Sequence, residues 1–244
     1  MNICRDDRSP HRGEKLADLR RLIGTAEGSL ASQPRRVIQF GIPALDRHLP
    51  QDGLPTGALH EVVSDIADGS AATGFVLALV SRLNSAAPLL WCRVGGSVAA
   101  TCLPYGPGLR DFGLAPERLI LVEAPDAAEA LWATEESLKT GGPCAVYVEG
   151  LKLDLRNSRR LQLAAERKGV TAFAHRPLGG GSLPPSAAMT RWLVSAAPLP
   201  PASQAKTCMW QIRLERCRGG APGQWIVEWH EQALSFHLAA AVSH

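Results

Sequence analysis

The chain has 244 residues, a length that suits one large α/β domain with or without a short arm. Hydrophobic residues make up 45% of it, enough for a sizeable core, and the net charge of only +3 excludes a strong overall attraction to nucleic acid or membranes. The six cysteines include no C-x-x-C pair, which predicts reduced thiols without a disulfide or a metal site, and we expect no cofactor. The N-terminus is charged, and no apolar run approaches the ~20 residues that span a bilayer, so we expect a cytoplasmic protein.

Residues 1–36 are predicted to form an N-terminal arm. Within it, residues 14–23 have a short helical pattern with Leu16, Leu19 and Ile23 on one face. A helix of this length is marginal on its own. We therefore favour a helix docked on the domain, and we keep a partner-binding segment or a weak basic patch as the alternatives.

The stretch from Gly53 to Leu83 has the order turn, strand, loop, helix, which is the layout of a phosphate-binding loop. Residues 59–63 are the predicted strand, residues 64–69 the loop and residues 71–83 the apolar helix. A phosphate-binding loop requires Gly, four residues, Gly, Lys and then Ser or Thr. The chain keeps this spacing but not these residues.

Three substitutions in this loop remove its chemistry. Ser64 stands at the position of the first glycine, and only the second glycine, Gly69, is kept. Ser70 stands at the position of the lysine that neutralises the β- and γ-phosphates, and Ala71 at that of the hydroxyl that binds magnesium. We therefore expect no catalytic residue here.

Asp65 and Asp68 add negative charge to the same loop, where they would oppose a triphosphate. The amides at a helix N-terminus still attract an anion, but these two carboxylates compete for them. From the loop alone, a lost nucleotide site and an ordinary connection that never bound nucleotide are equally compatible with the sequence.

Beyond the loop, apolar strands alternate with helical patterns, which predicts an α/β core over residues 37–205 with a mainly parallel sheet. Residues 95–117 and 176–188 are rich in Gly and Pro and are expected to form loops, the second a flexible surface loop. The remaining predicted strands are residues 89–94, 119–122, 144–149, 170–175 and 190–195, and the remaining predicted helices follow the caps Asp126 and Asp154 and end near residues 140 and 168.

The helix after Asp154 carries Arg156, Arg159 and Arg160. Such a charged stripe is usually a solvated helix face, and a DNA-binding patch is the less favoured interpretation. We keep these three arginines as candidates for contact with a partner or with DNA.

Residues 206–244 are predicted to form a β-hairpin and tail packed on the core. Trp210, Ile212 and Leu214 alternate with polar residues before a Gly-rich turn. An isolated hairpin is marginal in water, so its strands must extend the core sheet or pack on a partner. The basic residues beside the turn are expected to be exposed and to contact an acidic surface or nucleic acid. They are Arg213, Arg216 and Arg218.

A spaced motif near the start of the core carries a family resemblance. It consists of Gly41, Leu45-Asp46, Gly53-Leu54-Pro55, Gly57 and Glu61. This pattern resembles the start of the core of RecA-type recombinases, and it continues in register into the altered loop, which favours a lost nucleotide site. The resemblance implies a RecA-like P-loop-type core with a mainly parallel central sheet, a C-terminal antiparallel β-hairpin extension and a short N-terminal helical arm.

Three further features follow from this resemblance. Glu149, at the end of a predicted strand, stands where RecA-like proteins place the metal-supporting Walker B aspartate. The strand end at Arg93 has no counterpart of the glutamate that positions the attacking water. The connection at residues 150–153 is short, whereas the recombinases carry a long DNA-binding loop before the next helix.

The most specific feature is the closing segment, which runs from Trp210 through Arg216, Arg218 and the Gly-rich turn to Trp229. Together with the altered loop and the short connection it resembles the ImuA family of RecA-like accessory proteins of bacterial damage-induced mutagenesis, over about residues 37–238. The resemblance implies ImuB and an error-prone DNA polymerase III alpha-type subunit as partners, with RecA and the sliding clamp nearby. It also implies at most a weak DNA contact and no membrane contact.

We therefore expect a non-enzymatic scaffold of error-prone translesion synthesis in the SOS response, which is cytoplasmic and associates with the nucleoid when acting. A site without the lysine, the hydroxyl and the glutamate loses most of the electrostatic stabilisation of phosphoryl transfer. Two alternatives stay open. One is a weak ATPase or nucleotide-binding regulator that uses Glu149 and the loop at Gly69, and the other is a cell-division inhibitor, because the family is similar to SulA.

Overall fold

The computed structural model describes residues 36–83, 85–96, 104–178, 183–198 and 208–241. The chain divides into two compact units, residues 1–36 and 37–244, and all elements below belong to the second. The predicted arm and its helix lie outside the described residues. The elements are β1 (Val37–Ile38), α2 (Pro43–Asp46), η1 (Pro50–Asp52), β2 (Leu54–Pro55), β3 (Leu59–Ser64), η2 (Ile66–Asp68), α3 (Gly69–Ser81), β4 (Leu89–Val94), α4 (Gly106–Arg110), η4 (Pro116–Arg118), β5 (Leu119–Ala124), α5 (Ala127–Thr140), β6 (Ala145–Glu149), α6 (Leu155–Lys168), β7 (Thr171–Pro177), β8 (Thr190–Ala196), β9 (Cys208–Cys217), β10 (Gly223–His230) and β11 (Ser235–Ala241).

Nine strands form one sheet in the order β11-β10-β9-β8-β3-β7-β6-β4-β5. From β8 to β5 neighbouring strands are parallel, and β9, β10 and β11 continue the sheet through antiparallel pairs. The pair β1–β2 forms a separate two-stranded sheet. This confirms the predicted α/β class with a mostly parallel central sheet and C-terminal antiparallel strands.

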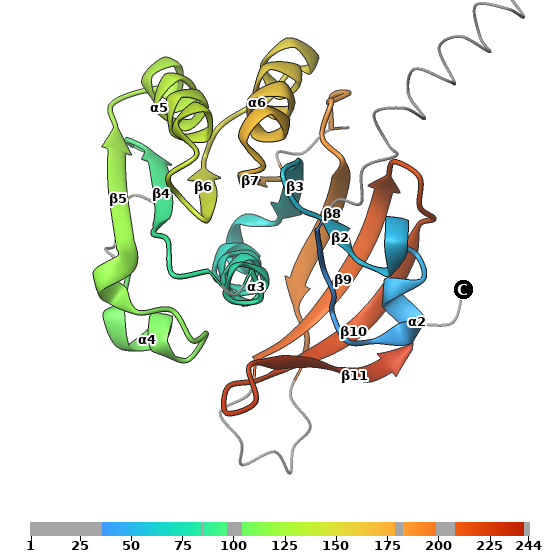
Figure 1. The fold of residues 1–244 in the computed structure, drawn as a ribbon. Coiled ribbons are helices and arrows are strands. Elements are labelled where there is room, and N and C mark those ends of the chain that lie inside the picture. Colours follow the sequence, from blue (N-terminus) through green and yellow to red (C-terminus); the bar gives the residue numbers. More distant parts are fainter. Residues whose placement is uncertain (1–35, 84, 97–103, 179–182, 199–207, 242–244) are drawn as a thin grey trace, which may run out of the picture. The chain divides into compact units, whose positions relative to one another are not determined.

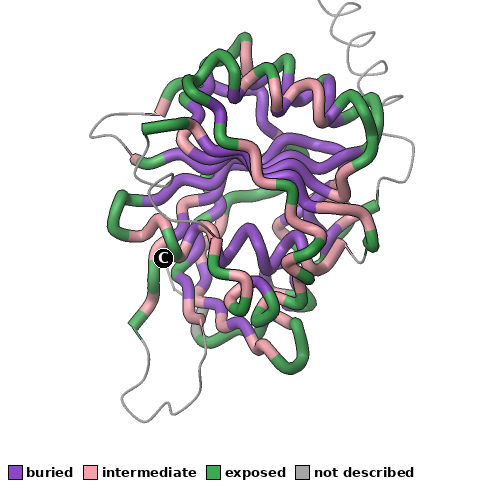
Figure 2. The backbone as a smooth tube through the Cα atoms, turned by 90° about the vertical axis from the view of Figure 1, so that its left-hand side faces the viewer, coloured by how far each residue is buried: buried purple, intermediate pink, exposed green. Residues whose placement is uncertain are grey.

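Helices cover both faces of the parallel part of the sheet. Figure 1 shows α5 and α6 on one face and α3 on the other, and in Figure 2 the strands form a buried band between these layers. The carboxylates of Asp126 and Asp154 accept hydrogen bonds from first-turn amides of α5 and α6, as the sequence predicts. Both helices end at a left-handed glycine, Gly141 or Gly169.

Alternate residues of each strand face two different hydrophobic clusters. Leu90, Val146 and Ala172 belong to the cluster that includes residues of α5 and α6, whereas Trp91 and Tyr147 belong to the cluster that includes α3. The parallel strands are therefore buried on both faces, which explains their continuous apolar runs.

The cluster around α3 is dominated by aromatic rings. The ring centroid of Phe75, on α3, lies 5.8 Å from that of Trp192, 6.0 Å from that of Trp210 and 6.1 Å from that of Phe236. Trp229 contacts Phe236 at 5.0 Å with a T-shaped geometry. The tryptophans of the predicted hairpin are thus core residues that fasten the antiparallel strands to the rest of the sheet.

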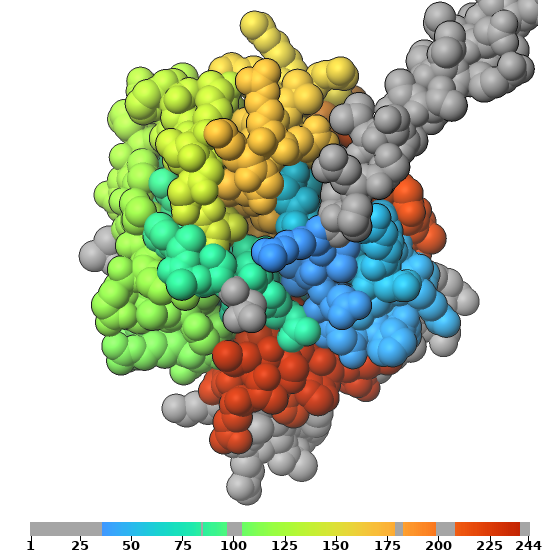
Figure 3. Space-filling view, viewed as in Figure 1, coloured from blue at the N-terminus to red at the C-terminus, as the bar shows by residue number. Residues whose placement is uncertain are grey.

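The first segment of the unit, from β1 to α2, packs against this cluster. In Figure 3 this segment (blue) lies against the C-terminal strands (red). Arg82, just after α3, joins the two through its guanidinium, which donates to the carbonyl of Gln39 at 2.6 Å and to that of Leu234 at 3.1 Å.

Three positions of the spaced motif near the start of the core have clear structural roles. The carboxylate of Asp46 accepts hydrogen bonds from the backbone amides of three residues, Phe40 to Ile42, and Gly41 among them has φ of +77°. At Gly57 a Cβ would lie 2.9 Å from the Cα of Gly169, because the two backbones touch there. This motif therefore specifies a fold rather than a reaction.

Three local predictions are wrong. Helix α3 begins at Gly69 instead of Ala71, and residues 106–110, expected in a loop, form the short helix α4. Residues 186–188, expected in a flexible surface loop, are buried because they pack between α6 and the sheet, while residues 179–182 of that loop lie outside the described residues. In the part of the chain that the structure describes, no helix is both long enough and apolar enough to cross a membrane.

Replacing Gly57 by alanine should destabilise the protein by more than about 2 kcal/mol. A positive φ costs a non-glycine residue about 1–2 kcal/mol, and the added methyl group also meets Gly169. Gly96 is the matched control, because it has φ of +71° with nothing within 4 Å of its Cβ position. Urea denaturation should show the larger loss for Gly57→Ala, and equal losses would contradict the close approach.

The fully buried ring of His60 should make stability depend on pH. Its Nε2 lies 2.9 Å from the carbonyl of Pro55 and its Nδ1 2.8 Å from the hydroxyl of Thr190, and burial lowers its pKa to about 4. Below pH 6.5 the unfolded chain binds a proton here while the folded protein does not. The free energy of unfolding should therefore fall between pH 6.5 and about 4, by up to about 1.4 kcal/mol per pH unit. Denaturation of His60→Gln across this range should lack this component, and an unchanged slope would count against it.

Candidate functional site

The altered loop lies at the carboxyl end of β3, between β3 and β7. From β3 the chain continues through α3 to β4 on one side, whereas β7 leads to β8 on the other side of β3. Ligands of open α/β sheets bind at such switch points. The fold therefore places residues 64–71 where a ligand would be expected, and their conformation decides whether one fits.

These residues do not form a phosphate cradle. Asp65 is extended, residues 66–68 form the 3-10 helix η2, and Gly69 begins α3 with helical φ of −55°. None of residues 64–71 has positive φ, so successive amides are not turned towards a common centre. The predicted loop is a direct connection into the helix.

The individual residues of the loop have separate roles. Ser70 is exposed, Ala71 packs against the core, and the carboxylate of Asp68 accepts a hydrogen bond of 3.0 Å from the amide of Ala196, at the end of β8. Asp65 is exposed. The two carboxylates therefore do not act as a pair, since one of them holds β8 in place.

Glu149 lies nearby and is buried, with 3% exposure. Its Oε1 accepts hydrogen bonds from the hydroxyls of Thr73 at 2.8 Å and Tyr147 at 2.7 Å, and its Oε2 accepts one from the indole of Trp91 at 3.0 Å. The ring nitrogen Nδ1 of His175 lies 3.6 Å from Oε1. Both oxygens of this carboxylate are thus occupied by side chains of the protein itself.

This network keeps Glu149 charged. Burial by itself raises its pKa, but His175, Tyr147 and Thr73 outweigh that effect and leave the pKa below its usual value. Burial together with the neighbouring charge of Glu149 raises the pKa of Tyr147 well above its usual value, so its hydroxyl stays a donor. Arg93 adds positive charge with its Nε 3.9 Å from Oε2.

The order Ser64, His175, Glu149 superficially resembles a hydrolytic triad. Nε2 of His175 does lie 2.9 Å from Oγ of Ser64, but that hydroxyl donates to the carbonyl of Asp65 and is buried. The 3.6 Å between His175 and Glu149 exceeds the reach of a hydrogen bond. These contacts fasten β3 to β6 and β7 and do not activate a nucleophile.

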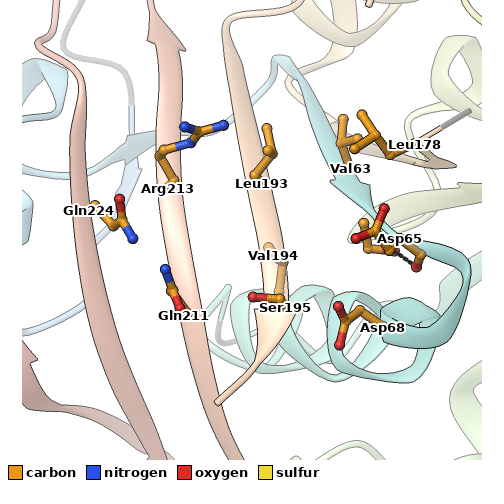
Figure 4. A pocket seen from close by; sticks show the side chains of 11 residues that line it. Val63, Asp65, Asp68, Leu178, Leu193, Val194, Ser195, Gln211, Arg213 and Gln224 are labelled. Carbon is orange, nitrogen blue, oxygen red and sulfur yellow. Dashed lines mark hydrogen bonds between the residues drawn. The ribbon is translucent and has the colours of Figure 1, made fainter. Parts of the chain in front are cut away.

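A hollow of about 240 Å³ opens beside the loop, away from Glu149. In Figure 4, Asp65 and Asp68 stand on one side of it and Arg213, Gln211 and Gln224 on the other. It is smaller than most small-molecule sites, and two carboxylates on its wall oppose a phosphate. The fold thus brings Asp65 and Asp68 near Arg213, a grouping that the sequence did not predict.

The candidate arginines fall into different environments. Arg160 forms an ion pair with Glu135 on α5, and Arg213 pairs with Glu215 at 3.0 Å. Arg216, expected to be exposed, is half-buried because its guanidinium donates to the carbonyl of Ala188 at 2.8 Å. Arg160 and Arg213 are exposed despite these ion pairs, as are Arg156, Arg159 and Arg218, which form no ion pair with another described residue.

Sequence reasoning missed Thr73, Trp91 and Tyr147 as partners of Glu149. Their signal was weak: Tyr147 and Glu149 share one face of a strand by alternation, but a tyrosine or a tryptophan in an apolar strand looks like a core residue. Which donor reaches which oxygen depends on how α3 packs on the sheet, which no local pattern encodes.

Two curated relatives match the chain, and each is a "Protein ImuA" of Caulobacter vibrioides, one from strain NA1000 / CB15N and one from strain ATCC 19089 / CIP 103742 / CB 15. Each is 37% identical over 227 residues, which cover 86% of this chain and 90% of the relative. The chain belongs to the ImuA family. No family model matches it.

Membership of the ImuA family confirms the resemblance seen in the sequence. In this ImuA-family chain the Glu149 carboxylate, at the end of β6, is surrounded by four neighbouring side chains. Within the described residues, no group of three or more His, Cys, Asp or Glu side chains is arranged to hold a metal ion. The surroundings of Glu149 are those of a structural centre.

The change Glu149→Gln should lower the free energy of unfolding by about 2–4 kcal/mol, because it removes the charge that Thr73, Tyr147 and Trp91 solvate. Glu123→Gln is the control, since Glu123 also approaches Arg93 at 3.9 Å but its side chain is 56% exposed. That variant should change stability by no more than about 0.5 kcal/mol. Equal effects of the two variants in urea denaturation would show that Glu149 is not a structural centre.

Proposed function

We propose that this chain is a non-enzymatic accessory protein of bacterial damage-induced mutagenesis, acting in error-prone translesion synthesis through contacts with other proteins. Membership of the ImuA family supports the process. The single observation that supports the lack of catalysis is that both oxygens of the buried Glu149 carboxylate accept hydrogen bonds from side chains of the protein, Thr73, Tyr147 and Trp91. These partners compete with a metal-bound nucleotide for this carboxylate.

A RecA-like core is part of this proposal. Its support is a parallel sheet whose first long strand, β3, runs through residues 64–71 into α3 at a topological switch point, with Glu149 at the end of β6, which is separated from β3 by β7. These are the positions of the two nucleotide-binding motifs in a P-loop-type core. In this chain both positions have been converted to structural use.

Weak ATP hydrolysis is disfavoured by the same geometry. Phosphoryl transfer depends on charges placed around the phosphates and metal. Ser70 contributes no charge, Ala71 is turned into the core, and Arg93 occupies the strand end where a water-positioning glutamate would be needed. The N-terminus of α3 still attracts the phosphates, but this attraction is small compared with that of a bound magnesium ion.

Partners of the proposed scaffold are ImuB and an error-prone replicative-type polymerase subunit. A protein without a catalytic centre acts by holding others, so its effect should be lost when these contacts are lost. Pull-down of ImuB, of the polymerase subunit, of RecA and of the sliding clamp by the tagged full-length chain would rank these partners. Failure to capture any of the four would contradict the scaffold.

A charge reversal in the altered loop separates scaffold from nucleotide use. Ser70→Glu places a carboxylate in the first turn of α3, where it favours the helix but repels a triphosphate. We expect Ser70→Glu to restore damage-induced mutation frequency in a deletion strain as well as the wild type does. Calorimetry should detect no binding of magnesium-ATP to the wild-type protein.

The paired variant Ser70→Lys restores the charge of a phosphate-binding lysine at the same exposed position. Equal mutation frequencies for wild type, Ser70→Glu and Ser70→Lys support a nucleotide-independent role. Loss of mutagenesis in Ser70→Glu alone, or a dissociation constant for ATP in the low micromolar range, would overturn it.

A further inference from the structure

The segment from Leu183 to Met189, called the strap below, lies between the start of α6 and the end of β9. The amide of Ala187 donates to the hydroxyl of Ser158 on α6 at 2.9 Å, and the carbonyl of Ala188 accepts from Arg216 on β9 at 2.8 Å. The strap thus joins α6 and β9, two arginine-bearing elements that are far apart in the sequence.

Two arginines anchor the strap: Arg191 donates to the carbonyl of Pro184 at 2.8 Å, and Arg216 donates to the carbonyl of Ala188 at 2.8 Å. A third, Arg176, donates to the carbonyl of Leu153 at 3.3 Å, just before α6. Arg176 and Arg191 are 8% and 9% exposed, and Arg216 is half-buried. Their guanidinium groups are fixed in position by the backbone.

One carboxylate compensates these three charges. Glu61 is fully buried, accepts a hydrogen bond of 2.7 Å from Nε of Arg191, and lies in one cross-strand row with Arg191 and Arg216. The three arginines repel one another: burial lowers the pKa of Arg216, and the charge of Arg191 lowers it further. Partly buried charges are screened less by salt than exposed ones.

Exposed cations surround the strap on both sides. Lys152, Arg156 and Arg159 lie at or near the start of α6, and Arg218 follows the end of β9. The nearby carboxylate of Asp154 caps α6, and Glu215 is paired with Arg213.

Together with Arg176, Arg191 and Arg216, these exposed cations make seven cationic side chains near two carboxylates, Glu61, which accepts from Arg191, and Asp154, which caps α6. This group therefore carries an excess of positive charge, although the net charge of the chain is only +3.

We propose that this basic surface around the strap binds the sugar–phosphate backbone of single-stranded DNA. Guanidinium groups pair with phosphate oxygens in a bidentate manner, and the anchoring arginines supply a fixed positive potential under the exposed ones. Among the described residues, the exposed large aromatic side chains, Tyr105 and Trp132, lie on other segments, so bases have no stacking platform here and we expect binding to be independent of sequence. The choice of a single strand rests on the proposed role in translesion synthesis, where the template is unpaired.

The proposal unites two arginine groups that the sequence treats separately. Arg156 and Arg159 come from one predicted patch and Arg216 and Arg218 from another, and the strap brings them to a common surface. Arg160 and Arg213 are excluded from it by their ion pairs with Glu135 and Glu215.

The test is fluorescence anisotropy of a labelled oligothymidylate with the full-length protein, at several salt concentrations. The variant Arg156→Glu/Arg218→Glu changes one exposed arginine on each side of the strap. We expect its affinity to fall at least ~10-fold and the slope of log K against log salt to fall by about 1.4, or 0.7 for each lost phosphate contact. Thermal unfolding should show that it folds like the wild type, since both residues are exposed.

Arg110→Glu/Arg167→Glu is the matched control. It makes the same change in net charge at two exposed arginines, one on α4 and one in the last turn of α6. It should keep most of the affinity and the full salt slope. Equal losses in the two double variants would mean that net charge alone drives binding, and would overturn the proposal.

Three further results would also overturn it. The first is that the protein does not bind the oligothymidylate at low salt, and the second is that it binds a duplex of the same length more tightly. The third is that polyglutamate displaces the oligonucleotide at a lower concentration than unlabelled oligothymidylate does. The last would identify an acidic protein as the ligand. None of these results bears on mutation frequency in cells, so failure of this surface and failure of the proposed function are distinguishable.

Discussion

The buried charge of Glu149 is the constraint on which the centre of this structure depends. A carboxylate in a core is tolerated only when donors replace water. Here they come from α3 (Thr73), β4 (Trp91) and β6 (Tyr147), and the ring of His175 on β7 lies 3.6 Å away, so the charge links the helix to three strands. Both oxygens of this carboxylate accept hydrogen bonds within the protein, and Glu149 therefore helps to hold the fold together.

The residues of the altered loop also have structural roles. Asp68 holds the end of β8 through Ala196, Ala71 packs into the core, and η2 leads directly into α3. The aromatic cluster around Phe75 then binds the antiparallel strands to the other side of α3. Helix α3 is therefore enclosed by structural contacts on its sheet-facing sides, whereas Ser70 in its first turn is exposed.

In the proposed non-enzymatic role, activity resides on the surface. Two surfaces of different character lie along β8: the hollow with Asp65 and Asp68, which residues 193–195 of β8 also line, and the basic surface around the strap, which precedes β8. A chain with net charge of +3 gives no hint of this separation, because opposite charges cancel in the sum. For an accessory protein such local potentials matter more than the total, since they steer encounters with particular partners.

The sequence by itself determined the α/β class, the core strands, the capped helices and the family, because each of these depends on short-range pattern: alternation, helical spacing, capping residues and spaced glycines. It also determined that the lysine and hydroxyl of a phosphate-binding loop are missing. Only the tertiary structure decided that Arg216 is half-buried while Arg218 is exposed, that Glu149 is saturated by Thr73, Tyr147 and Trp91, and that the strap brings distant arginines together. These contacts join residues that lie tens to more than a hundred positions apart, and they depend on the order of strands in the sheet and the packing of α3 and α6 upon it, which local pattern does not encode.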